Sequence, residues 1–184
     1  MSKVNPPLDG RMREFIEAQH IFFVGTAPVG AAGHVNISPK GMPTFRILGP
    51  SEVAYLDFVG SGAETIAHLR ENGRIVLMFC AFDGPPQIVR LHGRGQVLEP
   101  GEPGFELLLA AFEPAPGVRA IIRVNVTRIS DSCGYSVPRY SYEGERNQLT
   151  AWAQHKGPEG LVQYQKEKNA ASIDGMPALR WVQP

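Results

Sequence analysis

The segment GSGAETIAHLRENGR, residues 60–74, begins with two glycines that flank Ser61 and continues through Thr65 into a helical pattern. Exposed backbone amides beside Ser61 and Thr65, at the positive end of a helix, would bind an anion such as a phosphate. The same letters also fit a structural motif, because Ser61 as N-cap and Glu64 three residues later form a capping box. Such a box contributes about 1 kcal/mol and implies no ligand. Taken alone, the segment favours this structural interpretation, because helix-capping signals are commoner than phosphate sites. Glu64 would also place a negative charge where an anion would bind.

Neighbouring segments carry the positive charge that this loop lacks. NISPKG ends a predicted strand with Ser38 and Lys40, and TFRIL places Arg46 on the next strand. In an antiparallel sheet we expect these side chains to converge near the 60–65 loop and supply a cation. Lys40 as a solvated turn residue and Arg46 as an outward-facing charge are the plainer alternatives. Arg90, on the polar face of a later strand, has the same two interpretations.

Other catalytic and metal-binding motifs are absent from the sequence. Ser61 and Ser132 both miss the GxSxG pattern of hydrolases, and the histidines show neither HExxH nor paired spacing. Cys80 and Cys133 lie far apart without CxxC spacing, which predicts neither a zinc site nor a disulfide framework. The candidate chemistry is therefore anion or cofactor binding.

Composition bounds the class of protein. A chain of 184 residues is most simply one domain, able to bury roughly 70% of the surface that its unfolded form exposes. With 43% hydrophobic and 20% charged residues it is typical of soluble globular proteins, and a net charge of zero argues against nucleic-acid binding. Because it has no long apolar run and no secretory leader pattern, we expect no membrane span and a cytoplasmic location.

Seven runs rich in β-branched and aromatic residues, separated by glycine and proline, predict strands. They are HIFFVGTAP (20–28), HVNISPKG (34–41), TFRILGP (44–50), EVAYLDF (52–58), RIVLMFCAF (74–82), QIVRLHGRGQVLE (87–99) and VRAIIRVNVTRIS (118–130). We expect a mainly β fold, a closed or partly closed antiparallel barrel of six to seven strands with added helices.

The sixth run shows how such a barrel would bend. Val89, Leu91 and Val97 fall on one face at period two, and polar side chains fall on the other. Gly93 and Gly95 lie on the apolar face, where a missing side chain lets a strand bend or another segment approach.

Helical patterns divide the rest of the single domain, residues 1–184. They predict an N-terminal helix within 1–19 after a possible Asp9 cap, an inserted helix at 61–72, a short helix at 103–112, and two helices near 147–155 and 158–168. The barrel is expected over 20–133 and a helical C-terminal extension over 134–184.

The order NISPKG, FRIL, VAYLDFVGSGAET, AHLRENGRIVLMFCAF and PPQIVRLHGRG, over about 34–98, resembles the pyridoxamine 5'-phosphate oxidase-like family of FMN-binding split barrels. The likeness is to its uncharacterised bacterial branch rather than to the oxidase itself. It implies a split-barrel homodimer with FMN at the subunit interface and a small-molecule substrate. The positions that the family motifs and their order assign to FMN are Ser38, Lys40, Arg46, Ile47, Leu48, Asp57, Ser61, Gly62, Thr65 and Arg90.

The departures from the family pattern limit the predicted activity. The oxidases carry a Ser-Arg-Lys-like cluster at the helix start, where this chain has Ala63, Glu64 and Thr65. Their C-terminal Arg-x-His is also missing, because Arg180 is followed by Trp181 and valine. We therefore do not expect oxidation of pyridoxamine phosphate.

The resemblance predicts an FMN-dependent oxidoreductase in which the flavin exchanges a hydride or electrons with a small molecule and no side chain need act as acid or base. Two alternatives stay open. One is a non-catalytic split-barrel module that binds flavin or haem for storage or sensing. The other is a structural dimer whose ligand site is degenerate, with Glu64 as the symptom.

Overall fold

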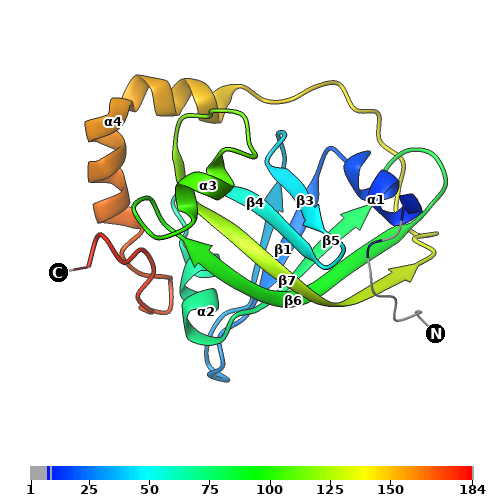
Figure 1. Cartoon of the computed structure of the whole chain (residues 1–184), viewed down its shortest axis with the longest axis horizontal. Coiled ribbons are helices and arrows are strands. Elements are labelled where there is room, and N and C mark those ends of the chain that lie inside the picture. The colour runs from blue at the N-terminus through cyan, green and yellow to red at the C-terminus, as the bar shows by residue number, and fades with distance from the viewer. Residues whose placement is uncertain (1–7, 9, 184) are drawn as a thin grey trace.

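The computed structural model describes residue 8 and residues 10–183, which fold into one curled antiparallel sheet with helices around it (Figure 1). The helices are α1 (Gly10–Glu17), α2 (Glu64–Asn72), α3 (Phe105–Leu109) and α4 (Gln148–Lys168). The strands are β1 (Phe22–Thr26), β2 (Asn36–Lys40), β3 (Phe45–Gly49), β4 (Glu52–Phe58), β5 (Arg74–Cys80), β6 (Ile88–Leu98) and β7 (Val118–Ser132). The mainly β class and all seven predicted strands are confirmed. Asp9, the expected cap of α1, lies outside the described residues.

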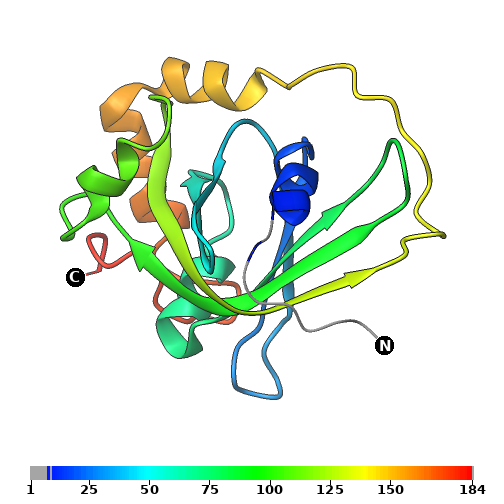
Figure 2. The ribbon, with the colours of Figure 1, turned by 45° about the vertical axis from the view of Figure 1, so that its right-hand side comes forward.

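The strand order is β2-β1-β5-β6-β7-β4-β3, and every neighbouring pair is antiparallel. The long strands β6 and β7 bend so that the sheet curls round on itself (Figure 2). Strands β2 and β3 are the two edges and follow one another in the chain, but they are not neighbours in the sheet. The expected barrel is therefore partly closed, as in a split barrel.

The main hydrophobic core fills the concave side of the sheet. Helix α1 contributes Met12 and Ile16, and α2 contributes Ile66 and Leu69. On the opposite side of β4 and β7, a smaller cluster packs under α3, which contributes Phe105. Strand β4 is thus buried on both faces, which explains why EVAYLDF is apolar in nearly every position.

Two glycines of β6 permit the close approaches that bend the sheet. The register between β6 and β7 shifts between His92 and Gly93, and a side chain at Gly93 would collide with the carbonyl oxygen of Asn125. At Gly95 a Cβ would come within 2.8 Å of the Leu69 side chain on α2. Both roles expected for the glycines, bending and close packing, are confirmed.

The C-terminal extension leaves the barrel after β7. Residues 133–147, called the strap below, contain no helix or strand and arch along the top of the molecule to α4 (Figures 1 and 2). Helix α4 is interrupted at Gly157, which has φ 64° and precedes Pro158, so the two predicted helices are confirmed as two arms of a kinked element. Among the described helices none has the length and apolar character needed to cross a membrane.

The crowding at Gly93 predicts a specific sensitivity. Gly93→Ala should lower the free energy of unfolding by about 1–3 kcal/mol, because the added methyl meets a backbone atom that cannot rotate away. Gly49→Ala on edge strand β3 is the matched control, since its Cβ would meet open space. Urea unfolding of both variants measures the difference, and equal stabilities would contradict the packing described here.

Candidate functional site

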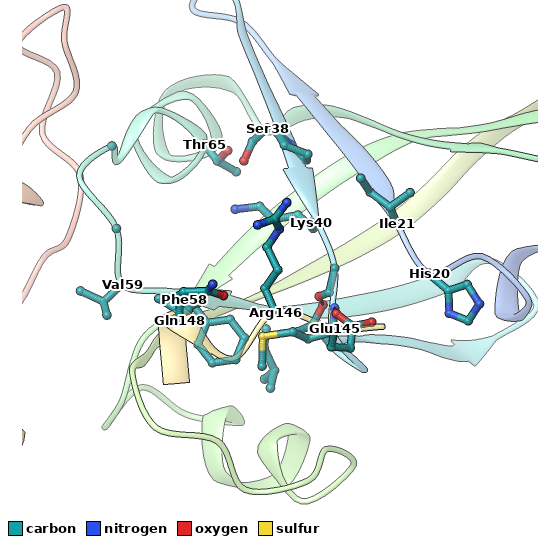
Figure 3. Close-up of a pocket in the computed structure, with 18 of the residues that line it drawn as sticks. His20, Ile21, Ser38, Lys40, Phe58, Val59, Thr65, Glu145, Arg146 and Gln148 are labelled. Atoms are coloured by element: carbon teal, nitrogen blue, oxygen red, sulfur yellow. Dashed lines mark hydrogen bonds between the residues drawn. The ribbon is translucent and has the colours of Figure 1, made fainter. Parts of the chain in front are cut away.

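A cavity of about 900 Å³ opens where the end of β2, the loop after β4, the first turn of α2 and the strap meet (Figure 3). Polar and charged side chains line much of it: His20, Asn36, Ser38, Lys40, Thr44, Glu64, Thr65, Arg119, Tyr142, Glu145, Arg146 and Gln148. Apolar side chains line the rest: Ile21, Met42, Leu56, Phe58, Val59 and Leu149. The volume and the mixed lining suit a molecule of cofactor size.

A buried ion cluster lies beside this cavity. The Asp57 carboxylate is fully buried and accepts hydrogen bonds from Lys40 Nζ at 3.0 Å and Arg119 Nε at 2.8 Å. Burial alone would raise the pKa of Asp57, but the charges and hydrogen bonds of Arg119 and Lys40 outweigh it and hold the pKa at about 2. Asp57 is therefore negative at neutral pH, and Lys40 keeps its other donors at the cavity wall.

A β-bulge brings Arg119 into this cluster. The register between β4 and β7 shifts between Asp57 and Phe58, which leaves Arg119 without an opposite residue. Regular alternation would turn Arg119 to the same face as Ile121, under α3, and the bulge re-aims it. Because Lys40 ends edge strand β2, the cluster also links that edge to β4, far away in the strand order.

The start of α2 differs from its prediction. The helix begins at Glu64, with Ala63 as N-cap and no side-chain cap hydrogen bond, so the expected capping box between Ser61 and Glu64 is wrong. The Glu64 carboxylate lies against Gly62, where a side chain would collide with it, and it accepts the N–H of Ile173 at 3.2 Å. The chain thus places its own negative charge at the positive end of α2.

A chain of polar side chains leads from the core to the cavity. Asn36 Nδ2 donates to Thr26 Oγ1 at 3.2 Å and to Thr65 Oγ1 at 2.9 Å, and Thr26 Oγ1 lies 3.0 Å from His68 Nδ1. Burial lowers the pKa of His68 and prevails over the nearby carboxylates that raise it. Because Thr65 accepts from Asn36, its own hydroxyl hydrogen can be donated to a ligand in the cavity.

The strap is fixed across the cavity by two contacts. The Tyr142 ring stacks on His20 with ring centroids 3.6 Å apart and planes 6° from parallel. The Glu145 carboxylate accepts the Met42 N–H at 3.1 Å and the Tyr142 hydroxyl at 2.9 Å. Arg146 follows directly, and its side chain extends into the cavity alongside Lys40 (Figure 3).

The structure gathers part of the predicted set at this cavity. Ser38, Lys40, Gly62 and Thr65 line it together, and Asp57 lies directly behind Lys40. The expected convergence of Lys40 with the 60–65 loop is therefore confirmed as geometry. The contact of each residue with FMN stays a prediction.

The other predicted residues lie elsewhere in the described chain. Arg46 lines a smaller cavity of about 350 Å³ together with Ile47, and its guanidinium donates to three backbone carbonyl oxygens. The expected convergence of Arg46 with the loop is not found in this chain, because those carbonyls hold it on the far side of β3. Leu48 is partly exposed, Arg90 donates to a serine hydroxyl on β7, and Ser61 is exposed in its loop.

Three residues of the site were missed in the sequence. Nothing in the sequence marked Arg119, because the alternation of apolar and polar residues along a strand does not reveal a β-bulge. Arg146 lies in the strap, whose sequence has no periodic pattern. Asn36 was detectable in principle, since NISPKG places an amide side chain in a strand beside the hydroxyl and the lysine that drew attention.

The ion cluster predicts a loss of stability in acid. Asp57 has a folded-state pKa of about 2 and an unfolded pKa of about 3.9. Its contribution of about 2 kcal/mol to the free energy of unfolding is therefore present above pH 4 and is lost as the pH falls toward 2. Asp57→Asn should lack this acid-dependent loss and should already be destabilised by roughly 3–5 kcal/mol at pH 7, because Arg119 keeps a buried charge without its partner.

Urea unfolding between pH 7 and pH 2 measures both effects. Asp83→Asn is the control, because Asp83 also pairs with an arginine, at 2.8 Å, but on the exposed surface. Near-wild-type stability of Asp57→Asn at pH 7 would contradict the role given to the cluster.

His68 predicts a second pH dependence, near neutrality. Since its pKa is lowered in the folded state, the unfolded chain binds the proton more readily, and stability should fall as the pH drops below about 6.5. His68→Asn keeps a polar partner for Thr26 but cannot titrate. Its free energy of unfolding should therefore change less between pH 7.5 and 5.5 than that of the wild type, whereas exposed His155→Asn should keep the wild-type slope. Equal slopes for both variants would exclude His68 as the source.

Comparisons with known proteins place the chain among its relatives. The family model for pyridoxamine 5'-phosphate oxidase matches residues 8–133. The pyridoxamine 5'-phosphate oxidase family protein ustO of Aspergillus flavus is 38% identical over 189 residues, covering 94% of this chain and 76% of that protein. That relative is fungal, so the resemblance extends beyond bacteria.

Solved structures share the fold. HupZ of Group A Streptococcus matches with a TM-score of 0.53 and 21% identity, over 72% of this chain and 98% of that one. A candidate pyridoxamine 5'-phosphate oxidase of Lactobacillus delbrueckii matches with a TM-score of 0.53 and 18% identity, over 70% and 98% of the two chains. The family match spans every strand of the sheet and the residues of the ion cluster, and the chain therefore belongs to the pyridoxamine 5'-phosphate oxidase family.

Proposed function

We propose that this protein binds flavin mononucleotide in the large cavity and uses it for hydride or electron transfer with a small molecule. Membership of the family supports this, and one observation carries it furthest. The cavity of about 900 Å³ is lined both by hydrogen-bond donors, among them Ser38, Lys40 and Thr65, and by apolar side chains, among them Phe58 and Val59 (Figure 3). A flavin combines a flat, largely apolar ring with a phosphate, and such a mixed lining offers contacts to both parts.

The donor set fits the phosphate better than the glycine loop does. Ser38, Lys40 and Thr65 present two hydroxyls and an ammonium to the same part of the cavity. Glu64 already lies against Gly62, so the phosphate would be held by these side chains rather than by the loop amides. Phe58 and Val59 would then contact the ring.

The protein's own contribution is to bind and orient the cofactor. When bound, FMN supplies the hydride or electron chemistry. The strap lines one side of the cavity, and Asp57 holds Lys40 in place. No acid or base residue is proposed. The absence of an Arg-x-His pattern at Arg180 argues against pyridoxamine phosphate as the substrate.

We further propose that the protein works as a cytoplasmic homodimer. Edge strand β2 borders the cavity and exposes Ile37, and Val35 just before it is also exposed, at 70% and 71% of their surfaces. Two large apolar side chains at an unpaired sheet edge favour contact with a second copy. Both cysteines are free thiols, which agrees with a reducing compartment.

The colour of the purified protein tests the proposal directly. We expect a yellow protein whose absorbance spectrum is that of a flavin and which releases FMN on denaturation. A colourless protein that does not bind added FMN would overturn the proposal, and a Soret band would favour the haem-binding alternative. Failure of bound flavin to be reduced by nicotinamide or deazaflavin donors would favour a non-catalytic binding module.

A conservative variant tests the position of the cofactor. Thr65→Val removes the hydroxyl that faces the cavity and should weaken FMN binding by roughly 3–10-fold, the effect of one hydrogen bond. Thr127→Val, on the exposed part of β7, should bind FMN like the wild type. Titration of flavin fluorescence measures both, and unchanged affinity in Thr65→Val would count against this placement.

A further inference from the structure

We propose that Arg146 of the strap is the anion receptor of the cavity, and that the ligand group it binds is an oxyanion, a phosphate or a carboxylate. The inference rests on the proposed function in one respect, that the cavity holds a ligand. It concerns a part of the chain that lies beyond residues 8–133, the range that the family model matches.

The charges around the cavity make Arg146 distinct. Lys40 and Arg119 share the carboxylate of Asp57, and Arg119 also reaches the carbonyl oxygen of Gly60 at 3.5 Å. Within the described chain, Arg146 lines the same cavity and has neither a hydrogen bond nor an ion pair of its own. Among the lining cations, Arg146 is thus the one whose charge no group in the described part of the chain neutralises.

The carboxylates nearby do not satisfy Arg146. Glu145 uses one oxygen on the Met42 N–H and the other on the Tyr142 hydroxyl. Glu64 accepts the N–H of Ile173 and lies against Gly62 at the start of α2. A ligand that brings its own negative charge would therefore complete the electrostatics at Arg146.

The strap holds Arg146 in position before any ligand arrives. Tyr142 stacks on His20, and Glu145, the residue just before Arg146, is anchored to the backbone of Met42. From this fixed point the Arg146 side chain extends into the cavity alongside Lys40 (Figure 3). Such preorganisation reduces the entropy that is lost on binding.

The neighbouring donors define the ligand class. Ser38 and Thr65 lie on the same side of the cavity, and Lys40 has donors left after it bonds Asp57 (Figure 3). A guanidinium presents a planar pair of donors that matches two oxygens of a phosphate or a carboxylate. Donors from three segments around one space select an oxyanion over a neutral polar group.

Two sources could supply this oxyanion, and binding measurements separate them. The first is the phosphate of FMN. If Arg146 receives it, Arg146→Gln should weaken FMN binding by about 10–100-fold and change the affinity for riboflavin, which lacks the phosphate, by less than about 2-fold. Arg139→Gln is the matched control, because Arg139 is a strap arginine that pairs with exposed Asp83 and does not line the cavity.

The second source is a small anionic molecule that binds beside the flavin. Flavin-loaded protein is titrated with phenyl phosphate and, separately, with phenol, and the change in the flavin spectrum is recorded. If Arg146 serves this ligand, Arg146→Gln should lose the response to phenyl phosphate while keeping wild-type affinity for FMN. If Arg146→Gln matches the wild type both in its affinity for FMN and in its response to phenyl phosphate, the inference is overturned and the proposed function is left intact.

Failure of the proposed function is recognised separately. If the wild type binds neither FMN nor riboflavin, thermal unfolding in inorganic phosphate and in chloride of equal ionic strength becomes the test. Stabilisation by phosphate in the wild type and in Arg139→Gln, and its loss in Arg146→Gln, would support the anion receptor without a flavin. Equal behaviour of all three proteins would overturn it.

Discussion

The buried contact between Asp57 and its two cations is the constraint on which the candidate site depends. Lys40 ends the edge strand β2, whereas Asp57 and Arg119 belong to β4 and β7 near the other edge of the sheet. No backbone pairing joins β2 to β4, so an ion cluster links them across the opening of the barrel. Buried charges are costly unless they are paired and hydrogen-bonded, and pairing therefore holds the three segments together. The ion cluster thereby holds the end of β2 next to β4, where both contribute to the wall of the cavity.

The segments after the barrel complete the cavity from outside. Asn169 Nδ2 donates a hydrogen bond to the carbonyl oxygen of Gly60 at 2.7 Å, and the Ile173 N–H donates one to the Glu64 carboxylate. These contacts fix the loop before α2 from residues that follow α4. The strap does the same for the opposite side through His20 and Met42. The barrel thus provides the ion cluster with Lys40, while the C-terminal extension adds Arg146 to the cavity and fixes Glu64 at its loop.

The sequence predicted the features that depend on local pattern. Runs of β-branched and aromatic residues between glycines and prolines located the seven strands, including the edge strands β2 and β3, which are only half-buried. Gly93 and Gly95 were assigned correctly, since only their place on the apolar face mattered. The capping box failed for a different reason: the partner of Glu64 is Ile173, which lies 109 residues along the chain. No local rule includes such a contact.

The same distinction separates the site residues that were predicted from those that were missed. Lys40 and Thr65 were found because they lie in short motifs with a recognisable order. Arg119 was missed because a one-residue bulge reverses the direction that alternation assigns to it. Arg46 was expected at the loop, yet nearby backbone carbonyls hold it at a smaller cavity, and only a folded chain reveals that competition.

Glu64 distinguishes the loop before α2 from a simple phosphate-binding loop. A helix start attracts negative charge, and here the first residue of α2 supplies it. An incoming anion would meet repulsion at Gly62 and attraction about Lys40 and Arg146. The electrostatic centre of the cavity is thereby shifted from the loop amides to side chains on β2 and the strap. If an anion binds as proposed, its orientation depends on Arg146, which lies in the extension beyond the residues that the family model matches.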